Sequence, residues 1–95
     1  MISTEMTQSL VRAIVTQQQM IIGPLAVVQA NKVNGLKISE DIRNVTVSGK
    51  FTDVLTDLVK QYEQLFGQAS VEVCKDAMRE LHIKIPLEDL PEILQ

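Results

Sequence analysis

The sequence is poor in the residues that build several common kinds of functional site. Its 95 residues include one cysteine, no tryptophan, one tyrosine and two phenylalanines. A single cysteine excludes an internal disulfide and a cysteine-rich zinc site, and so few aromatic rings offer little for stacking on bases. Nine scattered Lys and Arg residues against twelve acidic ones give a net charge of -3. We therefore expect no nucleic-acid partner, because phosphates require a clustered basic surface.

The chain also lacks an apolar run long enough to cross a bilayer. Its most hydrophobic stretch, residues 20–30 (MIIGPLAVVQA), is well short of the roughly 20 residues that a spanning helix needs. No cluster of Lys and Arg flanks this stretch, so a role at the membrane surface is not expected either. With no signal-peptide pattern and a lone cysteine, the sequence predicts a cytoplasmic protein without a membrane partner.

No group of residues has the composition of a catalytic or metal site. His82, the only histidine, has no evident partner group, so we interpret it as a helix-end or partly buried residue. Cys74 lies at an apolar position of its predicted helix, and no neighbouring basic cluster would lower the pKa of its thiol. Both observations favour a packing role. The acidic pairs 40–41 and 88–89 suit helix N-termini better than a metal, which needs more oxygen ligands. We predict no enzyme activity, no catalytic residue, no cofactor and no metal.

The apolar stretch is interrupted by Gly23-Pro24, and this dipeptide predicts a corner between two helices. Proline lacks a backbone N–H and clashes with the carbonyl four residues earlier, so a helix that begins near Glu5 should stop or kink here. Pro24 suits the first turn of a second helix, which we expect to run to about Lys32. The corner would carry apolar side chains on both of its arms.

The first helix carries very little charge. Arg12 is the only charged residue between residues 6 and 31. Because a helix that faces solvent normally carries more charge on its outer face, we expect residues 16–19 to form the exposed edge and much of the remainder to be covered.

Two further helices are predicted in the second half, at residues 51–66 and 68–82, with Gly67 between them and a last short helix from Pro86. One face of the helix at 51–66 is apolar, and we expect it to close the core: Phe51, Val54, Leu55, Leu58, Tyr62, Leu65 and Phe66.

Residues 36–50 are the least regular part of the sequence. Residues 45–47 (VTV) have the composition of a strand, but a lone strand would need an edge to pair with. We therefore favour a loop with a short helix at 40–44 over a strand.

These elements predict an all-α fold, a small helical bundle of four or five helices that forms one domain over residues 1–95. Aligning Gly23 with Gly67 also matches several apolar positions of the two halves. Residues 6–46 and 51–94 could therefore be two helix-corner-helix repeats, each covering the apolar face of the other.

The residues at the first corner, Ile22-Gly23-Pro24-Leu25-Ala26, resemble the IGPIA-type helical module that is appended to bacterial kinases, response regulators and related signalling proteins. The second half is similar only through the repeat, and residues 67–70 (GQAS) lack the proline. The resemblance implies a regulatory or assembly module without catalysis.

The uncharged apolar stretch predicts a contact surface, with an interface made by Met20, Ile21, Ile22, Leu25 and Val28. We expect a non-catalytic protein–protein interaction or regulatory module that self-associates as a homodimer and could also bind another signalling protein. The alternative is a carrier or sensor of a small apolar ligand, with its pocket between the two helical halves.

Overall fold

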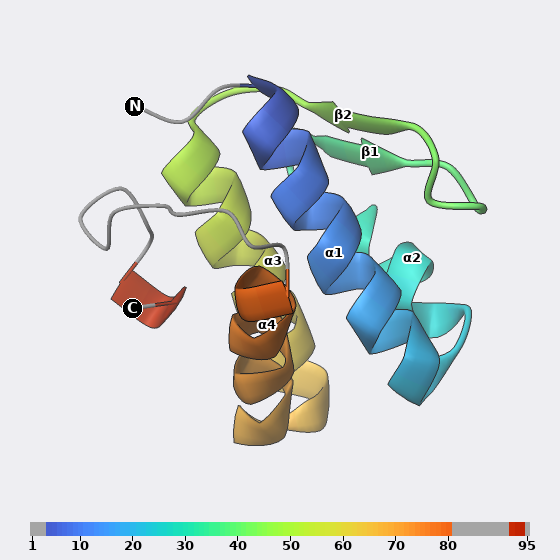
Figure 1. Ribbon diagram of the computed structural model, residues 1–95, viewed down its shortest axis with the longest axis vertical. Helices are drawn as coiled ribbons and strands as arrows, with labels where there is room; N and C mark the ends of the chain where they lie inside the picture. Colours follow the sequence, from blue (N-terminus) through green and yellow to red (C-terminus); the bar gives the residue numbers. More distant parts are fainter. Residues whose placement is uncertain (1–3, 81–91, 95) are drawn as a thin grey trace.

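Four helices and a short β-hairpin make up the described part of the chain, residues 4–80 and 92–94, in the computed structural model (Figure 1). In chain order the elements are α1 (Thr4–Ile22), α2 (Leu25–Ala30), β1 (Leu36–Ile38), β2 (Val45–Val47), α3 (Phe51–Phe66), α4 (Gln68–Glu80) and a 3-10 turn, η2 (Glu92–Leu94). Helix α1 packs against α2, α4 and β2, and α3 packs against α2 and α4. The fold is mostly helical, as predicted, but it is not all-α because it contains a two-stranded sheet.

The predicted corner at Gly23-Pro24 is confirmed. Helix α1 ends at Ile22 and α2 begins at Leu25. Between them Gly23 has a φ of +68°, which residues with a side chain adopt at a cost, and its N–H donates to the Gln19 carbonyl at 2.9 Å. Helix α2 has only six residues and ends at Ala30, slightly earlier than expected.

The prediction of a loop with a short helix at 40–44 is wrong. Strand β1 pairs antiparallel with β2, with Leu36 opposite Val47, Lys37 opposite Thr46 and Ile38 opposite Val45. The missing partner of residues 45–47 is therefore residues 36–38. Strand β1 buries Leu36 and Ile38 and exposes Lys37, while β2 buries Val45, partly buries Val47 and exposes Thr46, as a sheet with one covered face requires.

Side chains outside the hairpin help to hold it in place. The Asn31 amide pairs with the Ile38 backbone, accepting from its N–H at 2.8 Å and donating to its carbonyl at 3.0 Å. The Arg12 guanidinium on α1 donates to the carbonyls of Ile42 and Arg43, at 3.2 and 3.1 Å. Ile42 itself has a φ of +63° although it is β-branched and buried, which is a strained conformation. The turn is therefore held both by its own hydrogen bonds, among them the Ser39 N–H to the Asn44 carbonyl at 3.0 Å, and by Arg12 from outside the hairpin.

The core lies between the four helices and the inner face of the sheet. Tyr62 is its largest fully buried side chain, and its hydroxyl donates to the Ala26 carbonyl at 2.7 Å, which joins α3 to α2. Other fully buried side chains come from three helices: Leu10, Val11, Ile14, Val15, Leu55, Leu58, Val59 and Cys74.

Gln18 corrects part of the predicted exposure of α1. Thr16 is exposed, as expected for residues 16–19, but Gln18 is only 1% exposed. Its Nε2 donates to the Ser70 carbonyl at 3.1 Å and lies 3.6 Å from the Cys74 Sγ, so α4 covers it.

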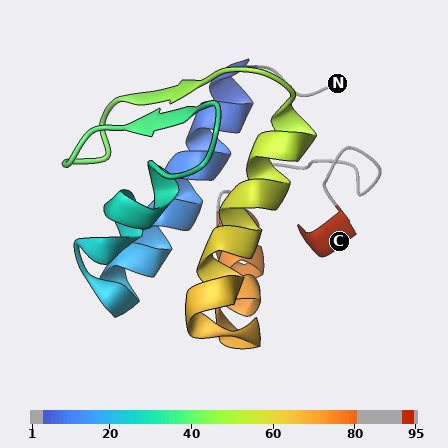
Figure 2. The same ribbon diagram turned by 180° about the vertical axis from the view of Figure 1, so that it is seen from behind.

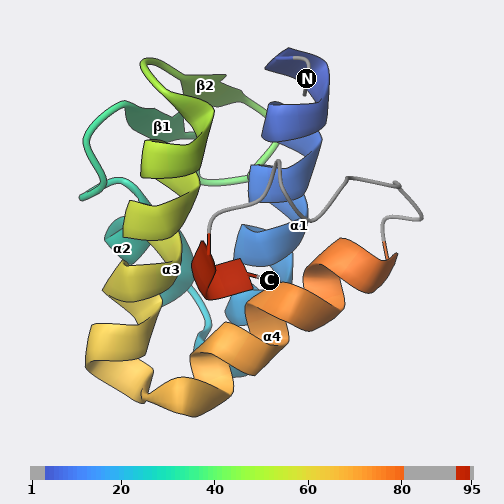
Figure 3. The ribbon, with the colours of Figure 1, turned by 90° about the vertical axis from the view of Figure 1, so that its left-hand side faces the viewer.

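The two helix corners lie at the same end of the molecule, which we call the corner end. Helices α1 and α3 both run toward it, and Gly67, with a φ of +81°, separates α3 from α4 there (Figure 3). The hairpin lies at the opposite end, beside the starts of α1 and α3 (Figure 2).

Several predictions concern parts of the chain that the structure does not describe. Four predicted features lie outside the described residues: the end of the fourth helix beyond Glu80, His82, the pair 88–89 and the start of the helix expected from Pro86. The internal repeat also stays a prediction. In the first half the hairpin follows α2, but most of the residues that would correspond to it in the second half lie outside the described residues.

Candidate functional site: an exposed apolar end

Four of the five residues predicted as an interface are exposed. The exposed fraction is 77% for Met20, 64% for Ile21, 49% for Leu25 and 51% for Val28. The fifth, Ile22, is half-buried and packs against the core. Large apolar side chains exposed together in this way are typical of an interaction surface.

The lengths of the two helices explain why these side chains are uncovered. Ile21 follows Ile14 by seven residues and so continues the buried stripe of α1. It lies beyond Gln18, however, the last α1 residue that is buried. In helix α2 the two alanines, Val27 and Gln29 are buried against the rest of the protein, whereas Leu25 and Val28 are exposed.

Two further exposed apolar residues, Leu65 and Phe66, were predicted to belong to the core, and that prediction is wrong. They end α3 at the second corner, with exposed fractions of 51% and 39%. Helical periodicity places them correctly on the apolar face of α3, but α4 departs at Gly67 and leaves this last turn uncovered. Their position directly before Gly67 was the signal that could have identified them as exposed.

The exposed apolar residues lie in segments without charge. Residues 13–31 contain no Asp, Glu, Lys or Arg, and neither do residues 64–71. These segments include the end of α1, all of α2, the last turn of α3 and the first turn of α4. Their polar side chains are largely glutamines, which can donate and accept hydrogen bonds without attracting or repelling a charged partner.

Two buried side chains next to this end, Cys74 and Tyr62, have raised pKa values. Burial raises the pKa of the Cys74 thiol to about 11, which keeps it protonated and unreactive at neutral pH. Burial, together with the neighbouring Cys74, also raises the pKa of the Tyr62 hydroxyl well above its ordinary value. Within the described residues, no group of three or more His, Cys, Asp and Glu side chains could hold a metal ion.

A pocket of about 400 Å³ lies beside the first corner. It is lined by Gln19, Pro24, Val27, Val28 and Glu40, from α1, α2 and the hairpin turn. The hollow thus adds a concave part to the exposed apolar surface, and Glu40 is a charged residue at its wall.

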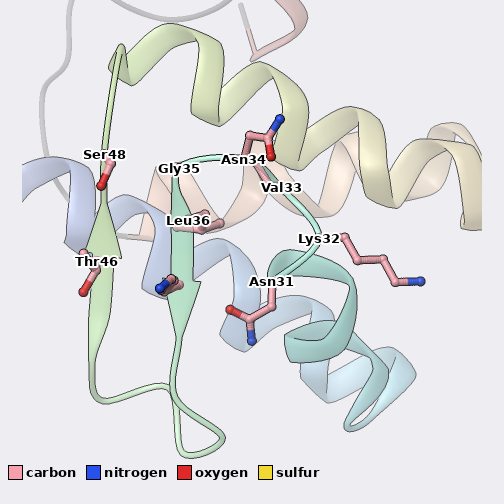
Figure 4. A pocket seen from close by; sticks show the side chains of 9 residues that line it. Asn31, Lys32, Val33, Asn34, Gly35, Leu36, Thr46 and Ser48 are labelled. Carbon is pink, nitrogen blue, oxygen red and sulfur yellow. The ribbon is translucent and has the colours of Figure 1, made fainter.

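A second pocket, of about 360 Å³, lies between the end of α2 and the hairpin (Figure 4). Asn31 lies between α2 and β1, where its amide is already bonded to the Ile38 backbone, and Lys32 points away from the strands. The Ser48 N–H donates to the Gly35 carbonyl at 2.6 Å. These hydrogen bonds hold the hairpin in place, and this structural role explains why polar groups line the pocket.

Comparisons with known proteins give no match: no family model, no curated protein and no solved structure is significantly similar to this chain. A search of the helices in the described residues for a segment that could span a membrane also finds none.

Proposed function

We propose that the protein is a non-catalytic interaction module that self-associates as a homodimer through the apolar surface of α1 and α2. The observation that carries this proposal is the exposure of Met20, Ile21, Leu25 and Val28 around one corner. Burying such side chains against a partner removes apolar surface from water, which is the main driving force of most protein association.

The resemblance of residues 22–26 to the IGPIA-type module supports a regulatory role, with a signalling protein as a further partner and the cytoplasm as the setting. The alternative of an apolar-ligand carrier has less support. The facing sides of the helices are filled by Tyr62, Gln18 and Cys74, which are all fully buried.

The test is the mass in solution, measured by light scattering over a concentration series, for the wild-type chain and Ile21→Asp. We expect a wild-type dimer and a monomeric variant, because an aspartate buried at the contact would have no partner. Ile21 suits this test better than Ile22, since it is 64% exposed and its replacement leaves the core intact.

Ser48→Asp is the matched control. It adds the same charge at an exposed position between β2 and α3, at the end opposite the corners, and should remain a dimer. A wild-type chain that stays monomeric at every concentration would refute the proposal, as would an Ile21→Asp variant that associates like the wild type.

A further inference from the structure

The second corner lies at the same end as the predicted interface, and two hydrogen bonds place the corners relative to each other. On one side Gln18 of α1 donates to the Ser70 carbonyl of α4 at 3.1 Å. Helix α1 runs toward the corner end and α4 runs away from it (Figure 3). Ile21 lies three residues beyond Gln18 on α1, and Gly67 lies three residues before Ser70, just before the start of α4. Both residues are therefore about one turn nearer the corner end than this hydrogen bond.

On the other side, the Gln61 Nε2 of α3 donates to the Gln29 Oε1 of α2 at 2.8 Å. Helix α2 returns from the first corner, whereas α3 approaches the second. Leu25 is four residues before Gln29, and Leu65 is four residues after Gln61, so each lies one helical turn nearer the corner end on the same face as its glutamine. Leu25 and Leu65 therefore belong to one surface.

The composition of this surface fits a protein partner. Six apolar side chains contribute to it: Met20, Ile21, Leu25, Val28, Leu65 and Phe66. Each of them is at least 39% exposed, and a protein interface of standard size buries about 800 Å² on each partner, so an exposed surface built from several large apolar side chains suits a protein partner. Without Leu65 and Phe66 the surface would lose two of its six apolar side chains.

The charge distribution favours a second copy of the chain as the occupant. A twofold axis sets a surface against itself, so a surface that carries charge of one sign throughout would be repelled by its own copy. With a net charge of -3, two copies repel each other over most approaches. The segments 13–31 and 64–71 carry no charge, so contact at the corner end avoids this repulsion.

From these observations we infer that the dimer contact spans both corners, so that Leu65 and Phe66 pack against the second copy together with the α1–α2 corner. This inference rests on the proposed function, because it assigns additional residues to the same self-association. It makes a separate prediction, however, since residues 65 and 66 lie outside the interface that the sequence predicts.

The experiment is sedimentation equilibrium of the wild type, Ile21→Asp, Leu65→Asp, Phe66→Asp and the control Ser48→Asp, with circular dichroism to verify the fold of each. We expect Leu65→Asp and Phe66→Asp each to raise the dimer dissociation constant by about 100-fold, the scale of a buried hot-spot residue. Leu65→Ser, which adds no charge, should raise it less, by about tenfold. Ser48→Asp should leave it unchanged.

The outcomes separate the inference from the proposed function. A dimer that is broken by Ile21→Asp but kept by folded Leu65→Asp, Phe66→Asp and Leu65→Ser variants would overturn the two-corner contact and leave the α1–α2 interface in place. A monomeric wild type would overturn both and leave the corner end for a different protein.

Discussion

At the scale of single residues, the buried polar side chains form hydrogen bonds between helices. These bonds fix the relative positions of the helices, which non-directional apolar packing alone would not. Tyr62 bonds to the Ala26 carbonyl, and Gln18 bonds to Ser70 and contacts Cys74. In the described residues, no buried side-chain nitrogen or oxygen lacks a partner. Such satisfied contacts add little net free energy, but removing one partner leaves a buried group unpaired and costs about 1 to 3 kcal/mol.

The buried thiol makes stability depend on pH in alkaline solution. The pKa of Cys74 is about 11 in the folded chain, against an ordinary value of 9.0 that we take for the unfolded chain. Between these values the unfolded chain loses a proton that the folded chain keeps, so the free energy of unfolding falls as pH rises above 9. The total loss from Cys74 is about 2 to 3 kcal/mol by pH 11, and Cys74 contributes no pH dependence below pH 9.

Denaturant unfolding followed by circular dichroism between pH 8 and pH 11 measures this effect, with Cys74→Ala as the comparison. In the variant the decline should begin near pH 10, the ordinary value for tyrosine, because the pKa of Tyr62 is also raised by burial. The comparison concerns the slope with pH, because the variant also loses packing and is less stable throughout. Equal slopes between pH 9 and pH 10 in the two proteins would contradict the assignment.

At the scale of elements, local patterns predicted the helices and distant contacts decided the hairpin. The period of 3.6 residues identified α3, and Gly23-Pro24 identified the first corner, because both signals act within a few residues of the chain. The strands have three residues each, too few for a period of two to be recognised. Besides the hydrogen bonds within the turn, Arg12 holds the turn and Asn31 holds the first strand, and neither residue belongs to the hairpin.

Local patterns also predicted only part of the candidate site. The uncharged stretch around the first corner indicated five residues, of which Met20, Ile21, Leu25 and Val28 are exposed while Ile22 is half-buried against the core. Leu65 and Phe66 were missed because periodicity shows which face of a helix is apolar. It does not show how far along that face a neighbouring helix extends.

Two glycines of the hairpin region provide a matched test of its packing. Gly35 and Gly49 have similar φ values, +85° and +89°, so alanine costs about 1 to 2 kcal/mol at either position through the backbone alone. At Gly35 the added methyl group would overlap the Ser48 carbonyl oxygen, whereas at Gly49 it would meet open space. We therefore expect Gly35→Ala to lower the free energy of unfolding by at least about 2 kcal/mol more than Gly49→Ala.

Thermal and denaturant unfolding of the two variants measure this difference. Equal losses would mean that β1 and the segment before α3 separate easily. They would also contradict the close approach that the Ser48 N–H to Gly35 carbonyl bond of 2.6 Å requires.

At the scale of the whole molecule, the two ends have different surfaces. The corner end combines uncharged segments with exposed apolar side chains, while the hairpin end carries charged residues such as Asp41 and Arg43, which form an exposed ion pair at 3.8 Å. Association through the corner end would therefore leave the charged groups of both copies in water, where they favour solubility.

This arrangement predicts an association that responds weakly to salt. Screening reduces interactions between charges, and the six apolar side chains of the proposed contact lie in uncharged segments, with Glu40 beside Val28 as a charged neighbour. The dimer dissociation constant should therefore change by less than about threefold between low and moderate ionic strength. Sedimentation equilibrium at several salt concentrations measures it. A steep weakening with salt would indicate charged contacts and therefore a different interface.

The strained turn at Ile42 also bears on the order in which the chain folds. A β-branched residue rarely adopts a positive φ in an isolated peptide, so the strain at Ile42 opposes the hydrogen bonds that the turn forms within itself, such as the Ile42 N–H to the Ser39 carbonyl at 2.9 Å. The turn's hydrogen bonds to Arg12 span about 30 residues of chain, and the loop that joins them must close before they can form. The hairpin should accordingly form late, on a surface that α1 has already built, and mutations within it should accelerate unfolding more than they slow folding.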